Sequence, residues 1–146
     1  MDLQDLDISE HHLKDVKLAM EFKYLAKQAP AGVYLLPEPD NIRQLHGVIF
    51  LRRGLYADGV FRFRIELPPS YNDVNTHPRI IFTPPIFNPF IDLQTGQLDL
   101  TVEESLREWI PDKHYIITAI TFLKKAFYAK SYEGYARLPN EKARRM

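Results

Sequence analysis

The chain has 146 residues and a mass of 17.1 kDa, and 45% of the residues are hydrophobic, which is typical of one soluble globular domain with a full core. Nineteen basic and nineteen acidic residues cancel, so the domain has no overall electrostatic attraction to nucleic acid or to a membrane surface. Cysteine is absent, which excludes a disulfide framework, a thiolate zinc site and a cysteine nucleophile.

The first predicted element is a helix over about residues 9–28. Its apolar residues recur three or four positions apart, a spacing that places them on one face of a helix. Ser9 is the predicted N-cap, and Pro30 with Gly32 ends the element. The face that we expect to pack on the core comprises Leu13, Val16, Met20 and Tyr24, widened by Ala19, Phe22 and Leu25.

Four strands follow, over residues 32–36, 47–51, 61–67 and 79–83. The second is a continuous apolar run, which predicts a strand buried on both faces. Consecutive antiparallel strands with one polar face form a meander whose apolar face needs a cover. The third strand alternates, with Phe61, Phe63, Ile65 and Leu67 on one face and Arg62, Arg64 and Glu66 on the other.

Residues 84–111 show few periodic signals, and a stretch of that length in a compact domain is usually functional. A second helix is predicted from there to about Lys130, on the spacing of Ile116, Ile120, Leu123 and Phe127. The order of helix, four-stranded antiparallel meander, long crossover and C-terminal helix defines an α+β fold. We therefore expect a single domain over residues 1–146, with its core at about 9–130 and a basic, solvated tail over 131–146.

The order of motifs along residues 9–130 resembles the ubiquitin-conjugating enzyme family. That family has proline-rich turns after its third strand, then a His-Pro-Asn flap, a Gly-x-x-Cys segment and Trp-x-Pro ahead of the next helix. Each motif alone is weak, but their order and spacing together are specific, and they imply the ubiquitin-conjugating fold. The corresponding segments here are Leu67-Pro68-Pro69-Ser70-Tyr71, Pro78, Phe87-Asn88-Pro89-Phe90, Gly96-Gln97-Leu98-Asp99-Leu100 and Trp109-Ile110-Pro111.

Three positions depart from the catalytic pattern of that family. Asp99 stands where the catalytic cysteine belongs, Asn88 where the flap histidine belongs, and Phe90 where the flap asparagine would stabilise the oxyanion. A carboxylate cannot form a thioester, and the loss of one oxyanion donor alone lowers a rate by about 100- to 1,000-fold. We therefore predict an inactive variant in which these positions are vestigial. We predict neither a cofactor nor a metal site, because the five histidines show no ligand spacing.

Among inactive variants the chain is similar to the fused toes (AKTIP) family. The similarity rests on residues 32–37, 47–50, 53–61, 85–92 and 95–99, including aspartate at the cysteine position. It implies a protein-interaction module that binds Hook coiled-coil proteins in an adaptor for dynein-driven vesicle transport, or that acts in telomere protection and DNA replication through protein partners. The neutral charge argues against direct binding to nucleic acid.

The expected location is intracellular, in the cytoplasm or the nucleus. The N-terminus is acidic, unlike that of a signal peptide, and no apolar run approaches the roughly 18 residues of a membrane span. Membrane insertion is therefore not expected.

Two other functions stay open at the level of sequence. The fold alone suggests a ubiquitin-signalling cofactor that binds ubiquitin or pairs with an active conjugating enzyme. A residual enzyme would use Asp99 as a general base, but no histidine or second carboxylate is placed beside it in the sequence. We therefore favour a vestigial or capping role for Asp99.

The candidate partner-binding residues lie in two loops and on the outer face of the sheet. Val74 and Ile110 are predicted to be exposed apolar contacts on loops that meet ligases or other partners in relatives. Trp109 lies beside Ile110, although packing beneath the second helix is the interpretation that we favour for it. Arg62 and Arg64 lie on the sheet face that holds ubiquitin in some relatives, and a simple solvated face is the competing interpretation.

Overall fold

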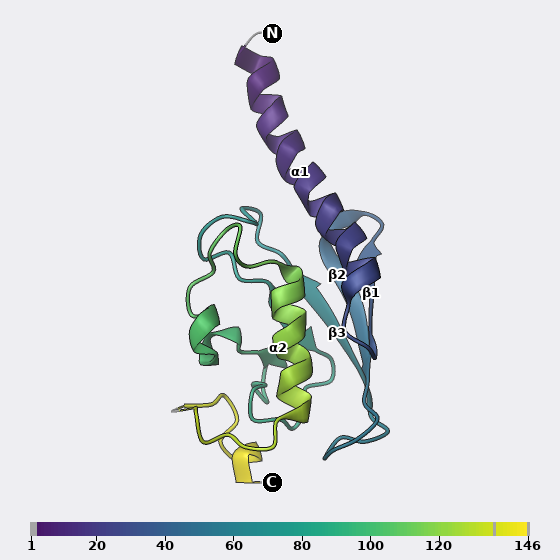
Figure 1. The fold of residues 1–146 in the computed structure, drawn as a ribbon, viewed down its shortest axis with the longest axis vertical. Coiled ribbons are helices and arrows are strands. Elements are labelled where there is room, and N and C mark those ends of the chain that lie inside the picture. The colour runs from purple at the N-terminus through teal and green to yellow at the C-terminus, as the bar shows by residue number, and fades with distance from the viewer. Residues whose placement is uncertain (1–2, 136, 146) are drawn as a thin grey trace.

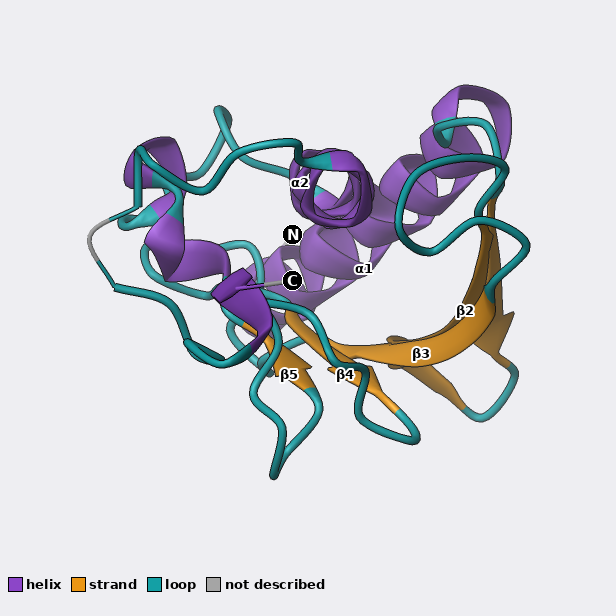
Figure 2. Ribbon diagram, turned by 90° about the horizontal axis from the view of Figure 1, so that it is seen from below, coloured by secondary structure: helices purple, strands orange, loops and turns teal. Residues whose placement is uncertain are grey.

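The computed structural model describes residues 3–135 and 137–145. One antiparallel sheet has the strand order β1-β2-β3-β4-β5, and Figure 2 shows both long helices on the same side of it. Neither of these helices, in the described part of the chain, combines the length and apolarity that crossing a membrane requires. The elements are α1 (Leu3–Gln28), β1 (Val33–Glu38), β2 (Asn41–Phe50), β3 (Val60–Glu66), β4 (Arg79–Phe82), β5 (Gln97–Leu98), the 3-10 turns η1 (Leu100–Val102) and η2 (Glu104–Leu106), α2 (Ile116–Tyr128) and η3 (Ala143–Arg145).

The core lies between α2 and the inner face of the sheet. Phe63 and Ile65 of β3 point inward, as their alternation predicted, and are 4% and 0% exposed. Phe63 lies opposite Gly47 of β2, where an added β-carbon would come within 2.3 Å of the Phe63 ring, so only glycine leaves room for that ring. Each fully buried apolar side chain stabilises the fold by about 1.5–3 kcal/mol. From α2, the core receives the residues that the sequence predicted, Ile116, Ile120, Leu123 and Phe127.

The helix α1 begins nearer the N-terminus than predicted, and of the predicted core face it buries Leu25 and part of Phe22 but not the central stripe. Ser9 lies inside the helix, so the predicted N-cap at that residue is wrong. Leu18 and Leu25 are 2% and 3% exposed, whereas Met20 of the predicted core stripe is 65% exposed. The helix meets the body along one side only, and its N-terminal half projects beyond the body (Figure 1), so the predicted stripe faces solvent. The exposed stripe consists of Leu13, Val16, Met20 and Tyr24.

The sheet differs from the prediction in two respects. The strand β2 is not buried on both faces, because Ile49 is 1% exposed but Phe50 is 44% exposed. Both helices cover the inner face, which leaves alternate residues of β2 on the outer face in contact with solvent (Figure 2). The predicted crossover also contains a fifth strand, β5, in which Leu98 pairs with Ile80 of β4.

The C-terminal segment packs partly against the body, so the predicted solvated tail is wrong for its buried residues. Leu138 and Ala143 are 4% and 0% exposed. The Asn140 backbone N–H donates to the carbonyl of Pro89 at 3.1 Å, which fastens the segment to the flap. Residues 136 and 146, which the predicted tail also included, lie outside the described residues.

Glu21 joins α1 to the start of α2. Its Oε1 accepts a hydrogen bond from the Tyr71 hydroxyl at 2.7 Å and another from the Ile116 backbone N–H at 2.9 Å. Burial raises the pKa of Glu21 above its usual value, and this effect outweighs the two hydrogen bonds, which lower the pKa. The folded protein therefore holds a proton on Glu21 more tightly than the unfolded chain does.

We expect the substitution Glu21→Gln to remove one pH-dependent contribution to stability. Because the pKa is raised on folding, the contribution of Glu21 is full below the unfolded pKa of 4.5 and is lost as the pH rises through the higher folded pKa. The free energy of unfolding of the natural chain minus that of the variant should therefore fall as the pH rises from about 4 to about 7. Urea denaturation of both proteins across this range measures the difference, and a difference that increased with pH would contradict the assignment.

Candidate functional site

Phe90, which the sequence motifs assign to the position of the oxyanion donor, is a core residue. Its side chain is 0% exposed and packs edge-to-face against Phe122 and Tyr135, with ring centroids 5.5 Å and 5.0 Å away. Tyr132 adds a third ring at 5.6 Å. Phe122 belongs to α2, whereas the two tyrosines come from the C-terminal segment. Aromatic rings therefore occupy the place where a polar donor would stabilise a developing negative charge.

Asn88, which the sequence motifs assign to the flap histidine position, shapes the backbone of the predicted flap. Its side chain is 0% exposed, and both of its polar atoms bond to main chain. Nδ2 donates to the carbonyl of Ala126 at 3.1 Å, and Oδ1 accepts the Phe90 backbone N–H at 2.9 Å. The first bond connects the flap to α2, and the second fixes the backbone at Phe90, whose side chain lies in the core. The side chain has no polar atom turned toward solvent for proton transfer.

Asp99, which the sequence motifs assign to the cysteine position, caps the 3-10 turn η1. Its Oδ1 accepts the backbone N–H of Thr101 at 2.9 Å and the hydroxyl of the same residue at 2.6 Å. His77 bonds to the Leu106 carbonyl, and His114 accepts from a backbone N–H in another loop, so neither histidine is hydrogen-bonded to the carboxylate. This geometry matches the capping role and provides no paired base for a nucleophile.

Trp109 connects the loop after β3 to the loop before α2 through hydrogen bonds. Its indole N–H donates to Asn72 Oδ1. Its backbone N–H donates to Asn75 Oδ1 at 3.0 Å, and the Asn75 N–H donates back to the Trp109 carbonyl at 2.8 Å. The prediction that Trp109 contacts a partner directly is wrong, because its side chain is 0% exposed. It packs inside the domain, as the competing interpretation held, between Tyr71 and His77.

His114 completes this junction as a neutral imidazole. Its Nδ1 accepts the Ile110 backbone N–H at 3.0 Å, and its carbonyl accepts Asn72 Nδ2 at 2.9 Å. Burial lowers the pKa of His114, and the positive charge of Lys113 lowers it further. The ring therefore stays uncharged at neutral pH, which leaves Nδ1 able to accept the bond that shapes the loop.

The two joined loops form one side of a groove, and α1 forms the other side. Val74 and Ile110 are 67% and 39% exposed and each follows or precedes a groove residue, namely Asp73 and Pro111. Hydrogen bonds between Asn75 and Trp109, their chain neighbours, bring these two exposed apolar residues near each other, beside the groove but not in its lining. Lys14 Nζ pairs with Asp73 Oδ2 at 3.2 Å across the groove. The groove is lined by Lys14, Lys17, Leu18, Met20, Glu21, Tyr24, Leu25, Tyr71, Asn72, Asp73, Pro111, Asp112, Tyr115 and Ile117.

Arg62 and Arg64 lie on the outer face of the sheet, away from the groove. Arg64 Nε donates to Glu66 Oε1 at 2.9 Å, and its guanidinium also reaches the Thr83 hydroxyl at 3.4 Å. Arg62 is exposed and has no ion-pair partner among residues 13–135. The structure therefore places these arginines apart from Val74 and Ile110, on a second surface.

Two parts of the site were missed by the sequence interpretation. Met20 and Tyr24, assigned to the core, line the groove instead. Tyr132 and Tyr135, assigned to a solvated tail, pack on Phe90. The aromatic residues in that segment were the available signal, since large aromatic side chains near a globular domain are usually buried at least in part.

Comparison with known proteins finds one matching family and several similar sequences. The family model for ubiquitin-conjugating enzyme matches residues 17–132. The proteins named AKT-interacting protein from Macaca fascicularis, Homo sapiens and Xenopus tropicalis are each 35% identical to this chain over 114 residues. The aligned region covers 78% of this chain and 38% of each relative, so the chain spans less than half the length of the curated relatives that it matches.

Proposed function

The chain belongs to the ubiquitin-conjugating enzyme family, as a variant similar to AKT-interacting protein, and from this membership and its altered flap we propose that it is a non-catalytic protein-interaction module. The chain has no cysteine, so it cannot carry ubiquitin as a cysteine thioester. The observation that carries the proposal is the burial of Phe90 at 0% exposure, in the place of a polar oxyanion donor.

The groove between α1 and the two joined loops is the proposed binding surface. Its apolar lining includes Met20 and Tyr24, which α1 leaves more than half exposed, and the exposed residues Val74 and Ile110 adjoin its lining residues Asp73 and Pro111. Such a cluster of exposed apolar side chains with a charged border is typical of a protein-binding surface. The buried junction around Trp109 supports this role, because a rigid surface lowers the entropy cost of binding.

The proposed partner is a Hook-type coiled-coil protein in a vesicle-transport adaptor, or else a chromosome-end or replication protein. Similarity to AKT-interacting protein supports both settings, and the name of that relative states an interaction with AKT. A tagged chain recovered from its source cells, followed by mass spectrometry, separates the settings by the identity of the co-purified protein. Recovery of no protein at all would contradict the proposal.

We expect the double substitution Val74→Asp with Ile110→Asp to reduce the recovered partner about tenfold, because charge replaces two apolar contacts beside the groove. Quantitative mass spectrometry of the captured partner is the measurement. Leu93→Asp is the matched control, since Leu93 is 51% exposed but, unlike Val74 and Ile110, has no chain neighbour that lines the groove. Full recovery with the double variant, or an equal loss with the control, would place the binding surface elsewhere.

The alternative of a ubiquitin-signalling cofactor predicts a different result in solution. Ubiquitin titrated into the labelled chain would then shift the backbone resonances of Arg62 and its neighbours on the outer sheet face. If titration to millimolar ubiquitin produced no such shifts, this alternative would be excluded. The outcome of the capture experiment is independent of ubiquitin binding.

A further inference from the structure

The outer face of the sheet carries a second concavity, distinct from the groove. It lies where β1 begins, β2 ends and β3 begins, and it shares no lining residue with the groove. Its apolar part consists of Tyr34, Phe50 and Val60, which are 62%, 44% and 53% exposed. The rings of Tyr34 and Phe50 meet edge-to-face with centroids 5.6 Å apart, and Phe50 lies opposite Val60 in the sheet register. We call these three residues the apolar floor.

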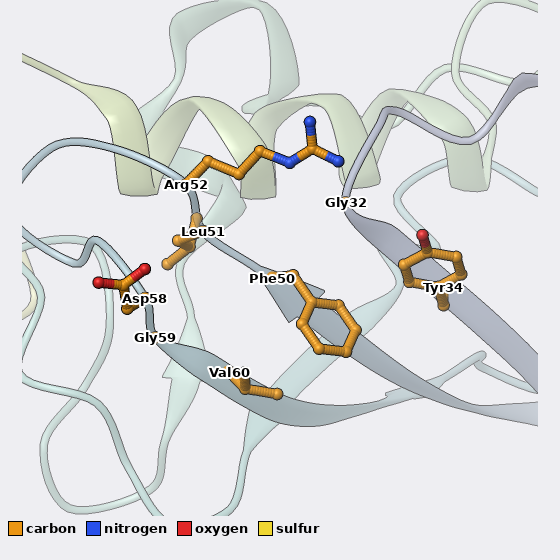
Figure 3. Close-up of a pocket in the computed structure, with 8 residues that line it drawn as sticks. All are labelled: Gly32, Tyr34, Phe50, Leu51, Arg52, Asp58, Gly59 and Val60. Atoms are coloured by element: carbon orange, nitrogen blue, oxygen red, sulfur yellow. The ribbon is translucent and has the colours of Figure 1, made fainter.

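Positive charge borders this floor on one side. Figure 3 shows the Arg52 side chain extending from the end of β2 toward Gly32, while Asp58 points to the other side of the pocket. Lys124 Nζ donates to the carbonyl of Ala31 at 2.9 Å, which brings a second cation beside Gly32. Arg53 follows Arg52 in the chain, and its guanidinium lies 5.7 Å from the centre of the Tyr128 ring. Lys124 Nζ lies 5.9 Å from the same ring centre.

Arg52, Arg53 and Lys124 differ from Arg64 and His46 of the outer face, both of which have an acidic partner. Arg64 is paired with Glu66 at 2.9 Å, and His46 with Glu38 at 2.7 Å. In the described part of the chain, by contrast, none of Arg52, Arg53 and Lys124 forms a salt bridge. Among the described residues, Arg52 and Asp58 are the charged residues that line the pocket. Arg53 and Lys124 adjoin the lining residues Arg52 and Gly32 without lining the pocket themselves, and with them the surroundings of the pocket carry more positive than negative charge.

We propose that this concavity binds an acidic, extended segment of a partner protein, with one aromatic or aliphatic side chain on the Tyr34–Phe50–Val60 floor and carboxylates beside Arg52 and Lys124. The apolar anchor removes exposed aromatic surface from water, and aromatic anchors contribute strongly to binding. The carboxylates complement the unpaired cations and set the orientation of the segment, because charge complementarity governs specificity and association rate. A basic segment would meet the same cations with repulsion.

The proposal is tested with a fluorescein-labelled probe peptide of one phenylalanine flanked on each side by three glutamates. We expect saturable binding in fluorescence anisotropy that weakens as salt is raised, because exposed charge pairs are screened. Arg52→Glu should weaken binding about tenfold, and so should Tyr34→Ala. Backbone resonances of Tyr34, Phe50 and Val60 should shift on titration with the probe.

Three controls define the outcome. Arg107→Glu reverses an exposed arginine that does not line the pocket and should leave the affinity unchanged. A probe with alanine for phenylalanine should bind about tenfold more weakly, and a probe with lysines for glutamates should not bind. Circular dichroism checks the folding of each variant, and the surface change Arg52→Glu keeps the test valid even if Tyr34→Ala unfolds.

The proposal is overturned if the acidic probe does not bind, or if Arg52→Glu and Arg107→Glu have the same affinity. It is also overturned if ubiquitin shifts the floor resonances while the acidic probe does not, because the surface would then recognise a folded protein instead of an acidic segment. The variants Val74→Asp and Ile110→Asp should not change probe binding, so failure here is distinguishable from failure of the groove.

Discussion

Phe90→Asn, which introduces the residue expected at this flap position in active relatives, should lower the free energy of unfolding by about 4–8 kcal/mol and restore no activity. The side chain is 0% exposed and lies among Phe122, Tyr132 and Tyr135. Loss of a buried phenylalanine costs about 3–5 kcal/mol, and an unpaired amide in its place costs a further 1–3 kcal/mol or so. Urea denaturation at fixed pH measures the loss.

Phe87→Asn is the matched control, because Phe87 lies in the same flap but is 44% exposed, and its substitution should cost less than about 1 kcal/mol. Combining Phe90→Asn with Asp99→Cys should still produce no transfer of ubiquitin to lysine when activating enzyme and ATP are supplied. Transfer by the double variant, or unchanged stability of Phe90→Asn, would contradict the view that aromatic packing has replaced the oxyanion site.

Trp109→Ala is expected to cost about 4 kcal/mol and to abolish partner capture indirectly. The indole is 0% exposed, and its removal leaves a cavity and deprives Asn72 Oδ1 of its donor. Because the same residue ties the two loops together, Val74 and Ile110 would no longer be held near each other. Chemical denaturation and capture of the partner are measured on the same preparation.

Trp109→Phe separates the two contributions, since it keeps a buried ring but loses the indole donor, at a cost of about 1–3 kcal/mol. We expect partner capture to follow stability across this series. Loss of capture with full stability would instead make Trp109 a direct contact, in contradiction of its burial.

The predicted elements that the structure confirms are those whose periodicity coincides with one-sided burial. The alternation of Phe63 and Ile65 in β3 and the spacing of Ile116 and Ile120 in α2 each match the buried face. The family match over residues 17–132 confirms the resemblance stated from the motifs. Local pattern is sufficient there because the same residues that form the element also form the core.

The helix α1 shows why periodicity alone was insufficient elsewhere. Leu18, Phe22 and Leu25 have the same three-and-four spacing as the exposed stripe, so the sequence contains two apolar faces on one helix. Contacts with the sheet and α2 bury the first of these sets. The second set remains on the surface, where Met20 and Tyr24 become part of the groove.

The strand β5 and the C-terminal segment were missed for a related reason. Two residues carry no measurable alternation, and Gln97–Leu98 becomes a strand only because Ile80 of β4 pairs with Leu98. Tyr132 and Tyr135 follow no helical or strand period, and their burial depends on the ring of Phe90, more than forty positions earlier in the chain.

The sequence by itself determined the α+β class and the family, together with the absence of a thioester cysteine, because these follow from local periodicity, motif order and residue identity. The tertiary structure alone decided which face of α1 is buried, what fills the flap around Phe90, and which exposed residues lie beside the groove or in the basic concavity. Those features depend on contacts between residues far apart in the chain, and no local pattern encodes which distant surfaces will meet.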